Sequence, residues 1–126
     1  MTRVLVVDDS ALVRDLHTFM LRGGGFEVRQ ASNGSEALEL LLTGKFDLIV
    51  SDVNMPKMDG LELTRRIRTT AGYQDTPVIL VSTEAEAKDR VNGLRAGANV
   101  YVVKPARAND LLLNARMLLN PEMGSC

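Results

Sequence analysis

Side chains able to take part in chemistry lie at the ends of four short apolar runs of the sequence: Asp8, Asp9, Asp52, Ser82, Thr83 and Lys104. Short apolar runs of this kind are typical of buried β-strands. If the strands are parallel, their carboxyl ends meet at one edge of the sheet, where open α/β sheets bind their ligands. Three carboxylates, the hydroxyl of Ser82 or Thr83, and an amine would then converge on one edge.

Three neighbouring carboxylates repel one another, so either their pKa values rise or a cation joins them. Oxygen ligands without histidine or cysteine favour Mg²⁺, which commonly keeps several waters and takes an oxygen from a phosphate. A carboxylate can attack a phosphoryl group while an amine and a metal ion neutralise the phosphoryl oxygens. Asp52 is the candidate nucleophile because it stands on the central strand of the group.

Each of these residues also has a purely structural interpretation. An Asp-Asp-Ser run after a strand is often only a helix N-cap. Asp52 alone could be a turn residue, and Lys104 alone a solvated side chain. Their joint placement at four strand ends favours the chemical interpretation.

The strands that position these residues are predicted from five apolar, β-branched runs: residues 4–7, 27–31, 48–50, 78–81 and 100–103. Parallel strands need crossover connections, and right-handed crossovers place helices on both faces of the sheet. The alternation of strands with helices therefore predicts an α/β fold. Five strands suit a flavodoxin-like, doubly wound (βα)5 parallel sheet with strand order 2-1-3-4-5.

Between the strands, apolar residues recur at the spacing of amphipathic helices that cover the sheet. These markers are Leu12, Leu16, Phe19 and Met20; Leu38, Leu41 and Leu42; Leu63 and Ile67; Ala87, Val91 and Leu94; and Leu111, Ala115, Leu118 and Leu119. Ser10 and Asn33 are placed to cap helices. Glycines at 23–25 are predicted to end the first helix, and Gly97 the fourth.

Composition limits the class of protein. The chain has 126 residues, 45% of them apolar and 25% charged, which predicts one globular domain over residues 1–126. Fifteen basic against sixteen acidic residues give a net charge of -1, which disfavours direct binding to nucleic acid or an anionic membrane. A single cysteine, Cys126, excludes an internal disulfide. With no apolar run near ~18 residues and no export signal, we expect a cytoplasmic protein, and a monomer.

Three sequence blocks together resemble the CheY-like receiver domain of bacterial two-component response regulators: residues 4–10, 52–60 and 101–105. The resemblance implies that Asp8 and Asp9 bind Mg²⁺ together with Asp52 and the backbone carbonyl of Asn54. It also implies that Asp52 accepts a phosphoryl group from a histidine kinase. Lys104 would pair with that group.

The resemblance also implies a switch. Its register selects Ser82 rather than Thr83 as the hydroxyl that hydrogen-bonds the phosphoryl oxygen. Tyr101 would then rotate from a more exposed to a more buried rotamer, changing the face of the fourth helix, fifth strand and fifth helix where partner proteins bind. Asn54 and Glu84, the pair found in chemotaxis regulators with short-lived phosphorylation, would border the path of the hydrolytic water.

Two residues depart from the family pattern. Ala106 stands where phenylalanine is common, which we expect to alter packing before the last helix. Thr83 stands where a small residue is usual, narrowing the mouth of the site and tempering a fast loss of the phosphoryl group. A receiver phosphorylates and dephosphorylates itself, so we expect no turnover of a separate substrate.

Other residues and other functions have plainer interpretations. His17 is expected on the surface, away from the strand ends, and the basic cluster Arg65, Arg66 and Arg68 on a solvated helix face. A haloacid-dehalogenase-type phosphatase would need an acid where Asn54 stands, and a flavodoxin-like electron carrier a hydroxyl- and glycine-rich loop instead of two acids. The alternatives that remain are the detached receiver of a hybrid kinase or multidomain regulator, and a phosphate sink.

Overall fold

Five parallel strands form one sheet in the order β2-β1-β3-β4-β5 in the computed structural model, which describes residues 2–120. The strands are β1 (Arg3–Val7), β2 (Glu27–Ala31), β3 (Leu48–Asp52), β4 (Val78–Ser82) and β5 (Val100–Val103). The predicted fold class and strand order are confirmed. Strands β3 and β4 run further than predicted and include Asp52 and Ser82 themselves. Cys126 lies outside the described residues.

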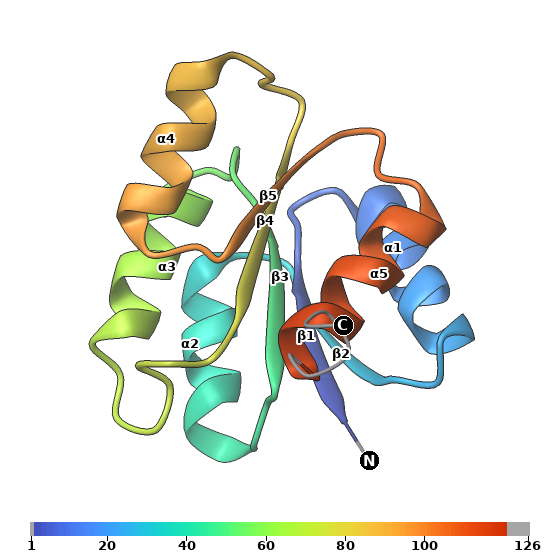
Figure 1. Ribbon diagram of the computed structural model, residues 1–126. Helices are drawn as coiled ribbons and strands as arrows, with labels where there is room; N and C mark the ends of the chain where they lie inside the picture. Colours follow the sequence, from blue (N-terminus) through green and yellow to red (C-terminus); the bar gives the residue numbers. More distant parts are fainter. Residues whose placement is uncertain (1, 121–126) are drawn as a thin grey trace.

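Five helices cover the two faces of the sheet (Figure 1). They are α1 (Ala11–Gly23), α2 (Gly34–Thr43), α3 (Gly60–Arg68), α4 (Ala87–Ala96) and α5 (Ala108–Leu119). Helices α1 and α5 lie together on one face, and α2, α3 and α4 lie on the other (Figure 1). In the described part of the chain, none of the helices combines the length and the apolar character needed to cross a membrane.

The two faces have separate cores because successive strand residues point to opposite sides. Leu5, Ile49 and Leu80 pack on the side of α3, and the neighbouring residues Val4 and Val50 pack on the side of α1 and α5. Each of these five side chains is essentially inaccessible to solvent. Strands buried on both faces read as continuous apolar runs, which explains why the sequence located them so well.

The pairing register brings the ends of the strands to one edge. Val7 is level with Ser51, Asp52 with Val81, and Ser82 with Val103. The residues that follow β1 and β5 therefore extend from the same edge at which β3 and β4 end.

The predicted caps are confirmed. The side chains of Ser10 and Asn33 accept hydrogen bonds from backbone N–H groups in the first turns of α1 and α2. Helix α1 ends at Gly23, and α4 is closed by Gly97, whose φ of 114° is in the left-handed region that glycine tolerates best. Asp59 caps α3 in the same way as Asn33 caps α2.

Helix α1 is turned differently from the prediction. Its apolar markers Leu12 and Phe19 are 80% and 76% exposed, and Leu16 is about half exposed. The buried side of the helix carries Leu21 together with the polar residues His17 and Thr18, and among the predicted markers Met20 packs against the core. The expectation that His17 lies on the surface is therefore wrong.

The burial of Thr18 on this side of α1 is tolerated because its hydroxyl is hydrogen-bonded. Thr18 Oγ1 donates to the carbonyl of Arg14 at 2.8 Å and lies 2.8 Å from the side-chain nitrogen of Gln30, from which it accepts. A buried hydroxyl with partners costs little, whereas an unpaired one costs about 1–3 kcal/mol. Apolar spacing alone therefore did not determine which side of α1 meets the sheet.

The basic cluster on α3 divides into two kinds of residue. Arg65 and Arg66 are exposed and pair with Glu62, as predicted for a solvated face. Arg68 instead donates to the carbonyls of Thr76 at 2.7 Å and Gly97 at 3.0 Å. The prediction is wrong for Arg68, which ties α3 to the loops before β4 and β5.

Candidate functional site

Three carboxylates meet at the edge formed by the strand ends. Asp8, Asp9 and Asp52 each offer an oxygen within 4.8 Å of the others. Asp8 and Asp52 are buried, with Asp52 only 6% exposed, while Asp9 is exposed. The cluster is thus recessed on one side and open to solvent on the other.

Lys104 reaches this cluster from the end of β5. Its Nζ lies 2.8 Å from Asp52 Oδ1 and 3.2 Å from Asp8 Oδ2. Burial raises the pKa of Asp52, against the hydrogen bond from Lys104, which lowers it. Burial opposes the charge on Lys104, but the hydrogen bond and charge of Asp52 and the charge of Asp8 outweigh it and raise the pKa of the ammonium. The ammonium of Lys104 is therefore held in its charged form between Asp8 and Asp52.

Asp8 is held by its own neighbours. Its second oxygen, Oδ1, accepts the backbone N–H of Ser10 at 2.9 Å, and the guanidinium of Arg14 donates to its carbonyl at 2.8 Å. These contacts fix the β1–α1 turn, so the carboxylate is oriented before any ligand binds. Sequence analysis missed Arg14, which looks like an ordinary helix residue in the sequence.

The two adjacent hydroxyl residues are placed differently. Ser82 is completely buried, whereas Thr83 is exposed. Ser82 Oγ accepts the backbone N–H of Glu84 at 3.1 Å and lies 3.5 Å from the side-chain nitrogen of Asn54. Because these contacts use its lone pairs, the hydroxyl proton of Ser82 stays available for another acceptor.

Tyr101 is buried in this structure, with 8% of its surface exposed. Its hydroxyl donates to the carbonyl of Glu84 at 2.8 Å, and the guanidinium of Arg90 lies 5.8 Å from the ring centroid. A β-carbon built on Gly93 would lie 2.8 Å from the ring, closer than such atoms pack. The ring thus occupies the space that Gly93 leaves open on α4.

Gly60 ends the sequence block 52–60, but no role was predicted for it. A β-carbon at this position would collide with the backbone carbonyl of Asp52, and the Gly60 N–H donates to the carbonyl of Val53 at 2.8 Å. The start of α3 therefore packs directly on the backbone that carries Asp52. Only glycine permits so close an approach.

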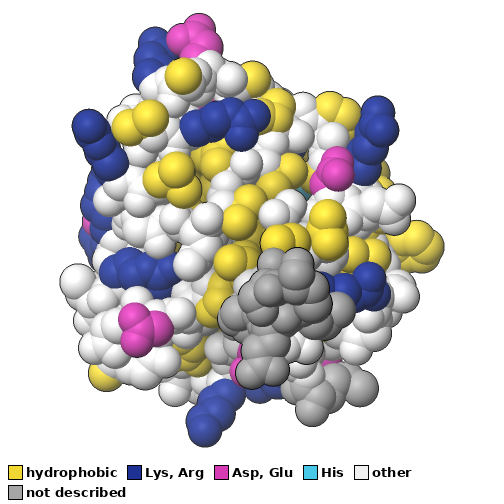
Figure 2. Space-filling view, viewed as in Figure 1, with side chains coloured by type: hydrophobic (Ala, Val, Ile, Leu, Met, Phe, Trp, Pro, Cys, Tyr) yellow, Lys and Arg dark blue, Asp and Glu magenta, His cyan; other side chains and the backbone are white. Residues whose placement is uncertain are grey.

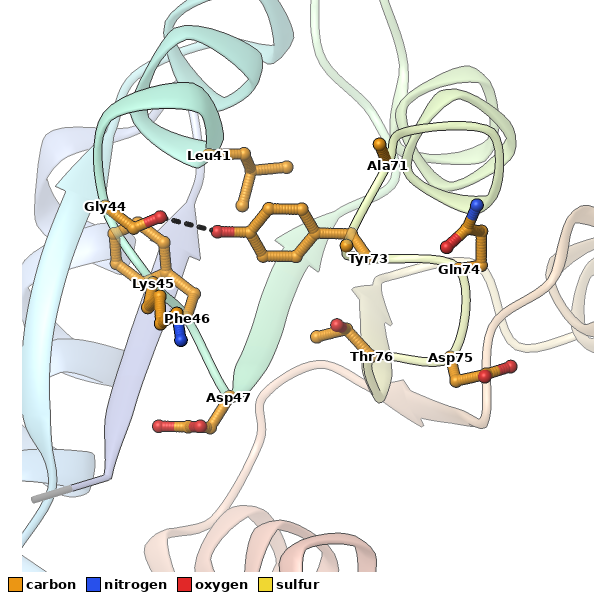
Figure 3. Close-up of a pocket in the computed structure, with 11 residues that line it drawn as sticks. Leu41, Gly44, Lys45, Phe46, Asp47, Ala71, Tyr73, Gln74, Asp75 and Thr76 are labelled. Carbon is orange, nitrogen blue, oxygen red and sulfur yellow. Dashed lines mark hydrogen bonds between the residues drawn. The ribbon is translucent and has the colours of Figure 1, made fainter.

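A cavity of about 670 Å³ lies elsewhere (Figure 3). Its lining includes Phe46 and Tyr73, and the hydroxyl of Tyr73 donates to the carbonyl of Gly44 at 2.7 Å (Figure 3). These residues precede β3 and β4, so the cavity opens at the opposite edge of the sheet from the carboxylates. It contributes nothing to the acidic site.

Comparison with known proteins assigns the family. The profile of the response regulator receiver domain matches residues 4–116. The chain belongs to this family. Receiver domains are signalling domains of two-component systems that switch on phosphorylation, not classical enzymes, and they bind Mg²⁺ at an acidic pocket.

Particular relatives are similar over most of the chain. Response regulator MprA of Mycolicibacterium vanbaalenii is 40% identical over 117 residues, which are 93% of this chain and 50% of that protein. Transcriptional regulatory protein DltR of Streptococcus agalactiae is 37% identical, over 91% of this chain and 50% of its own. The chain thus spans about half the length of the curated relatives it matches.

Solved structures agree with this assignment. Chemotaxis protein CheY4 of Vibrio cholerae superposes with a TM-score of 0.90 at 37% identity, over 94% of this chain and 99% of CheY4. The receiver domain of a signal transduction histidine kinase from Syntrophus aciditrophicus gives a TM-score of 0.88 at 31% identity, over 96% of this chain and 92% of its own.

Proposed function

We propose that Asp52 accepts a phosphoryl group from the phosphohistidine of a histidine kinase and that this changes the affinity of the domain, residues 1–126, for a partner protein. The observation that carries the proposal is the placement of Asp52. It is a recessed carboxylate beside Asp8 and Asp9, hydrogen-bonded by Lys104. A nucleophile for phosphoryl transfer needs this kind of charge-balanced surrounding.

The proposed reaction follows from the residues present. A carboxylate oxygen of Asp52 attacks phosphorus, the phosphorus–nitrogen bond of the donor breaks, and its electron pair leaves with the imidazole. The ammonium of Lys104 moves to the phosphoryl oxygens, and Ser82 donates its free hydroxyl proton to one of them. In this proposal Lys104 and Ser82 act on the oxygens, and Asp52 alone forms the covalent bond.

The carboxylate cluster fits a magnesium ion. Three carboxylate oxygens within 4.8 Å suit a hard cation of small radius, and neither histidine nor cysteine is among them. Asp8, Asp9 and Asp52 would hold the ion with the backbone carbonyl of Asn54. When bound, Mg²⁺ supplies positive charge toward the phosphoryl oxygens.

Ser82 and Tyr101 are the proposed switch. The family resemblance implies a ring that moves from exposed to buried on phosphorylation, whereas the ring of Tyr101 is already buried in this structure. A two-state domain contains both arrangements before phosphorylation, which only shifts their populations. The hydrogen bond from Tyr101 to Glu84 links the ring to the segment that follows Ser82.

The proposed output surface is the face of α4, β5 and α5. Figure 2 shows hydrophobic side chains gathered along β5 between α4 and α5. Val91 and Leu94 of α4 and Leu113 and Met117 of α5 are about half exposed. Exposed apolar side chains grouped in this way favour a protein partner over nucleic acid.

The lifetime of the phosphoryl group is proposed to depend on the rim of the site. Asn54, Thr83 and Glu84 are all exposed around the buried Asp52 and Ser82. Polar side chains there can admit and orient water, so we expect fast self-dephosphorylation, tempered by Thr83. A bulkier side chain at Asn54 or Glu84 should change the decay rate.

The location, the oligomeric state and the kind of protein that contains this domain are also proposals. We infer a cytoplasmic monomer that acts on a protein target, as a chemotaxis-type regulator does. The alternative is that this chain is the detached receiver of a hybrid kinase or of a multidomain regulator. This alternative is supported by the similarity to the Syntrophus aciditrophicus kinase receiver and to relatives of twice the length. A phosphate sink would show the same chemistry without the switch.

Labelling with phosphoramidate tests the proposal. Intact mass should rise by one phosphoryl group in the presence of Mg²⁺, and not in excess chelator or in Asp52→Asn. Ser82→Ala should still be labelled, with a weaker effect on partner binding. Equal labelling of Asp52→Asn would overturn the assignment.

A further inference from the structure

A second cavity, of about 280 Å³, lies between α1 and the segment that follows β5. Its walls are mainly aliphatic and come from Val13, Leu16, Pro105 and Ala106. Ala106 leaves space here because it has only a methyl group. The cavity is small enough to suit a single ring.

His17 also lines this cavity. The residue is 97% buried, yet among the described residues no side chain or backbone group hydrogen-bonds its imidazole. Burial lowers the pKa of His17 and the charge of Lys104 lowers it further, against the charge of Asp8, which favours the neutral ring with one donor and one acceptor. In the described part of the chain, Arg3 Nε is the one fully buried side-chain nitrogen or oxygen without a partner, so the His17 nitrogens reach the open space of the cavity, where a ligand can hydrogen-bond them.

Water is a poor occupant of this cavity. Buried waters typically make about three hydrogen bonds, and besides His17 the polar side chains of the lining are Thr83 and Lys104. The nearby ammonium of Lys104 is already engaged by Asp8 and Asp52. An apolar ring that brings one hydroxyl would displace such water favourably and satisfy the imidazole.

We propose that this cavity binds a phenol-type ring, with its hydroxyl hydrogen-bonded to His17 and its carbons packed against Val13, Leu16 and Pro105. Lys104 lines both this cavity and the acidic site. A ring in the cavity therefore restricts the movement of Lys104 and changes the rate at which Asp52 is phosphorylated. That kinetic consequence rests on the proposed function, whereas the binding does not.

Titration with p-cresol, followed by NMR, tests the binding. We expect saturable shifts of Val13, His17 and Ala106, and toluene, which lacks the hydroxyl, should bind about two- to tenfold more weakly because it loses one hydrogen bond. In His17→Phe the preference for p-cresol over toluene should disappear. Ala106→Phe fills the cavity and should weaken both ligands at least tenfold, with Ala106→Leu as a smaller filling change.

Leu12→Ala is the matched control, because Leu12 is exposed on the same helix and does not line the cavity. Unchanged p-cresol affinity in this variant is expected. Binding that is lost in Leu12→Ala but kept in Ala106→Phe would overturn the proposal, as would shifts that never saturate.

Two further arms separate the possibilities. Asp52→Asn should bind p-cresol normally. If phosphoramidate failed to label the unsubstituted protein, the proposed function would be overturned and the cavity assignment would stay intact. Tighter binding of N-acetyltyrosinamide than of p-cresol would identify the ring as a tyrosine presented by a protein. Weaker binding would identify a free small molecule.

Discussion

Gly93→Ala should reveal how firmly the ring of Tyr101 is packed against α4. In an exposed helix, alanine is about 1 kcal/mol more favourable than glycine. Here the new methyl group would lie 2.8 Å from Tyr101 Cδ2 and 3.3 Å from a methyl carbon of Leu80. Forcing an extra carbon into a packed site costs about 1–3 kcal/mol. The two effects together predict a net change between about zero and 2 kcal/mol of destabilisation.

The clash can be separated from the helix effect by removing the ring. In a Tyr101→Ala background the closest contact is gone, so Gly93→Ala should stabilise by about 1 kcal/mol. The coupling between the two positions is therefore predicted at about 1–3 kcal/mol. Urea denaturation of the four proteins in the cycle measures it.

Gly23→Ala provides the control, because a β-carbon at Gly23 meets no atom within 4 Å. This variant should not be destabilised by packing in either background. If Gly93→Ala stabilises equally with and without Tyr101, the ring does not rest against α4 in solution, and the proposed role of Tyr101 as a switch loses its structural basis. A folded Gly93→Ala protein should also show a more exposed tyrosine by NMR.

Three further outcomes are expected. Burial lowers the pKa of His17 below its ordinary 6.5, so the unfolded chain takes up the proton at a higher pH than the folded one. The stability linked to His17 should therefore be present above about pH 6.5 and fall as the pH drops toward the lower folded-state pKa. Urea denaturation at several pH values should show a shallower fall for His17→Phe. Arg68→Met removes charge-assisted hydrogen bonds to the carbonyls of Thr76 and Gly97 and should cost at least about 2 kcal/mol, against little change for the exposed Arg65→Met. Gly60→Ala should lower both stability and phosphoramidate labelling, because its methyl group meets the carbonyl of Asp52; full labelling of this variant would contradict the packing described.

The strand ends could be predicted because their signals are local. Buried parallel strands are apolar runs, and the residues that end them are read directly from the sequence, so Asp8, Asp52 and Lys104 could be placed at one edge. The order of the strands followed from the fold class. What the sequence could not supply is the set of contacts between those side chains, because they depend on register and on side-chain reach.

The orientation of α1 could not be predicted from the spacing of its apolar residues, because that spacing does not indicate which side of the helix meets the sheet. The burial of Thr18 depends on partners supplied by Arg14 and Gln30, and a helical pattern does not include a residue from a neighbouring strand. The same holds for Gly60, whose importance comes from a backbone carbonyl eight residues earlier. In both cases the deciding contact is made by atoms of a neighbouring strand, which the spacing of apolar residues along a helix does not indicate.

The contact between Lys104 and Asp8 has a mechanical consequence. In the sheet order, β1 and β5 are separated by β3 and β4, so the residues that follow them start about 14 Å apart at ordinary strand spacing. Their ion pair bridges this gap, and the lysine stem must arch across the ends of β3 and β4. Any anionic group that becomes attached to Asp52 lies beside the Lys104 side chain and competes with Asp8 for the lysine ammonium. A change at Asp52 on the central strand β3 therefore acts directly, through Lys104, on the end of the outer strand β5.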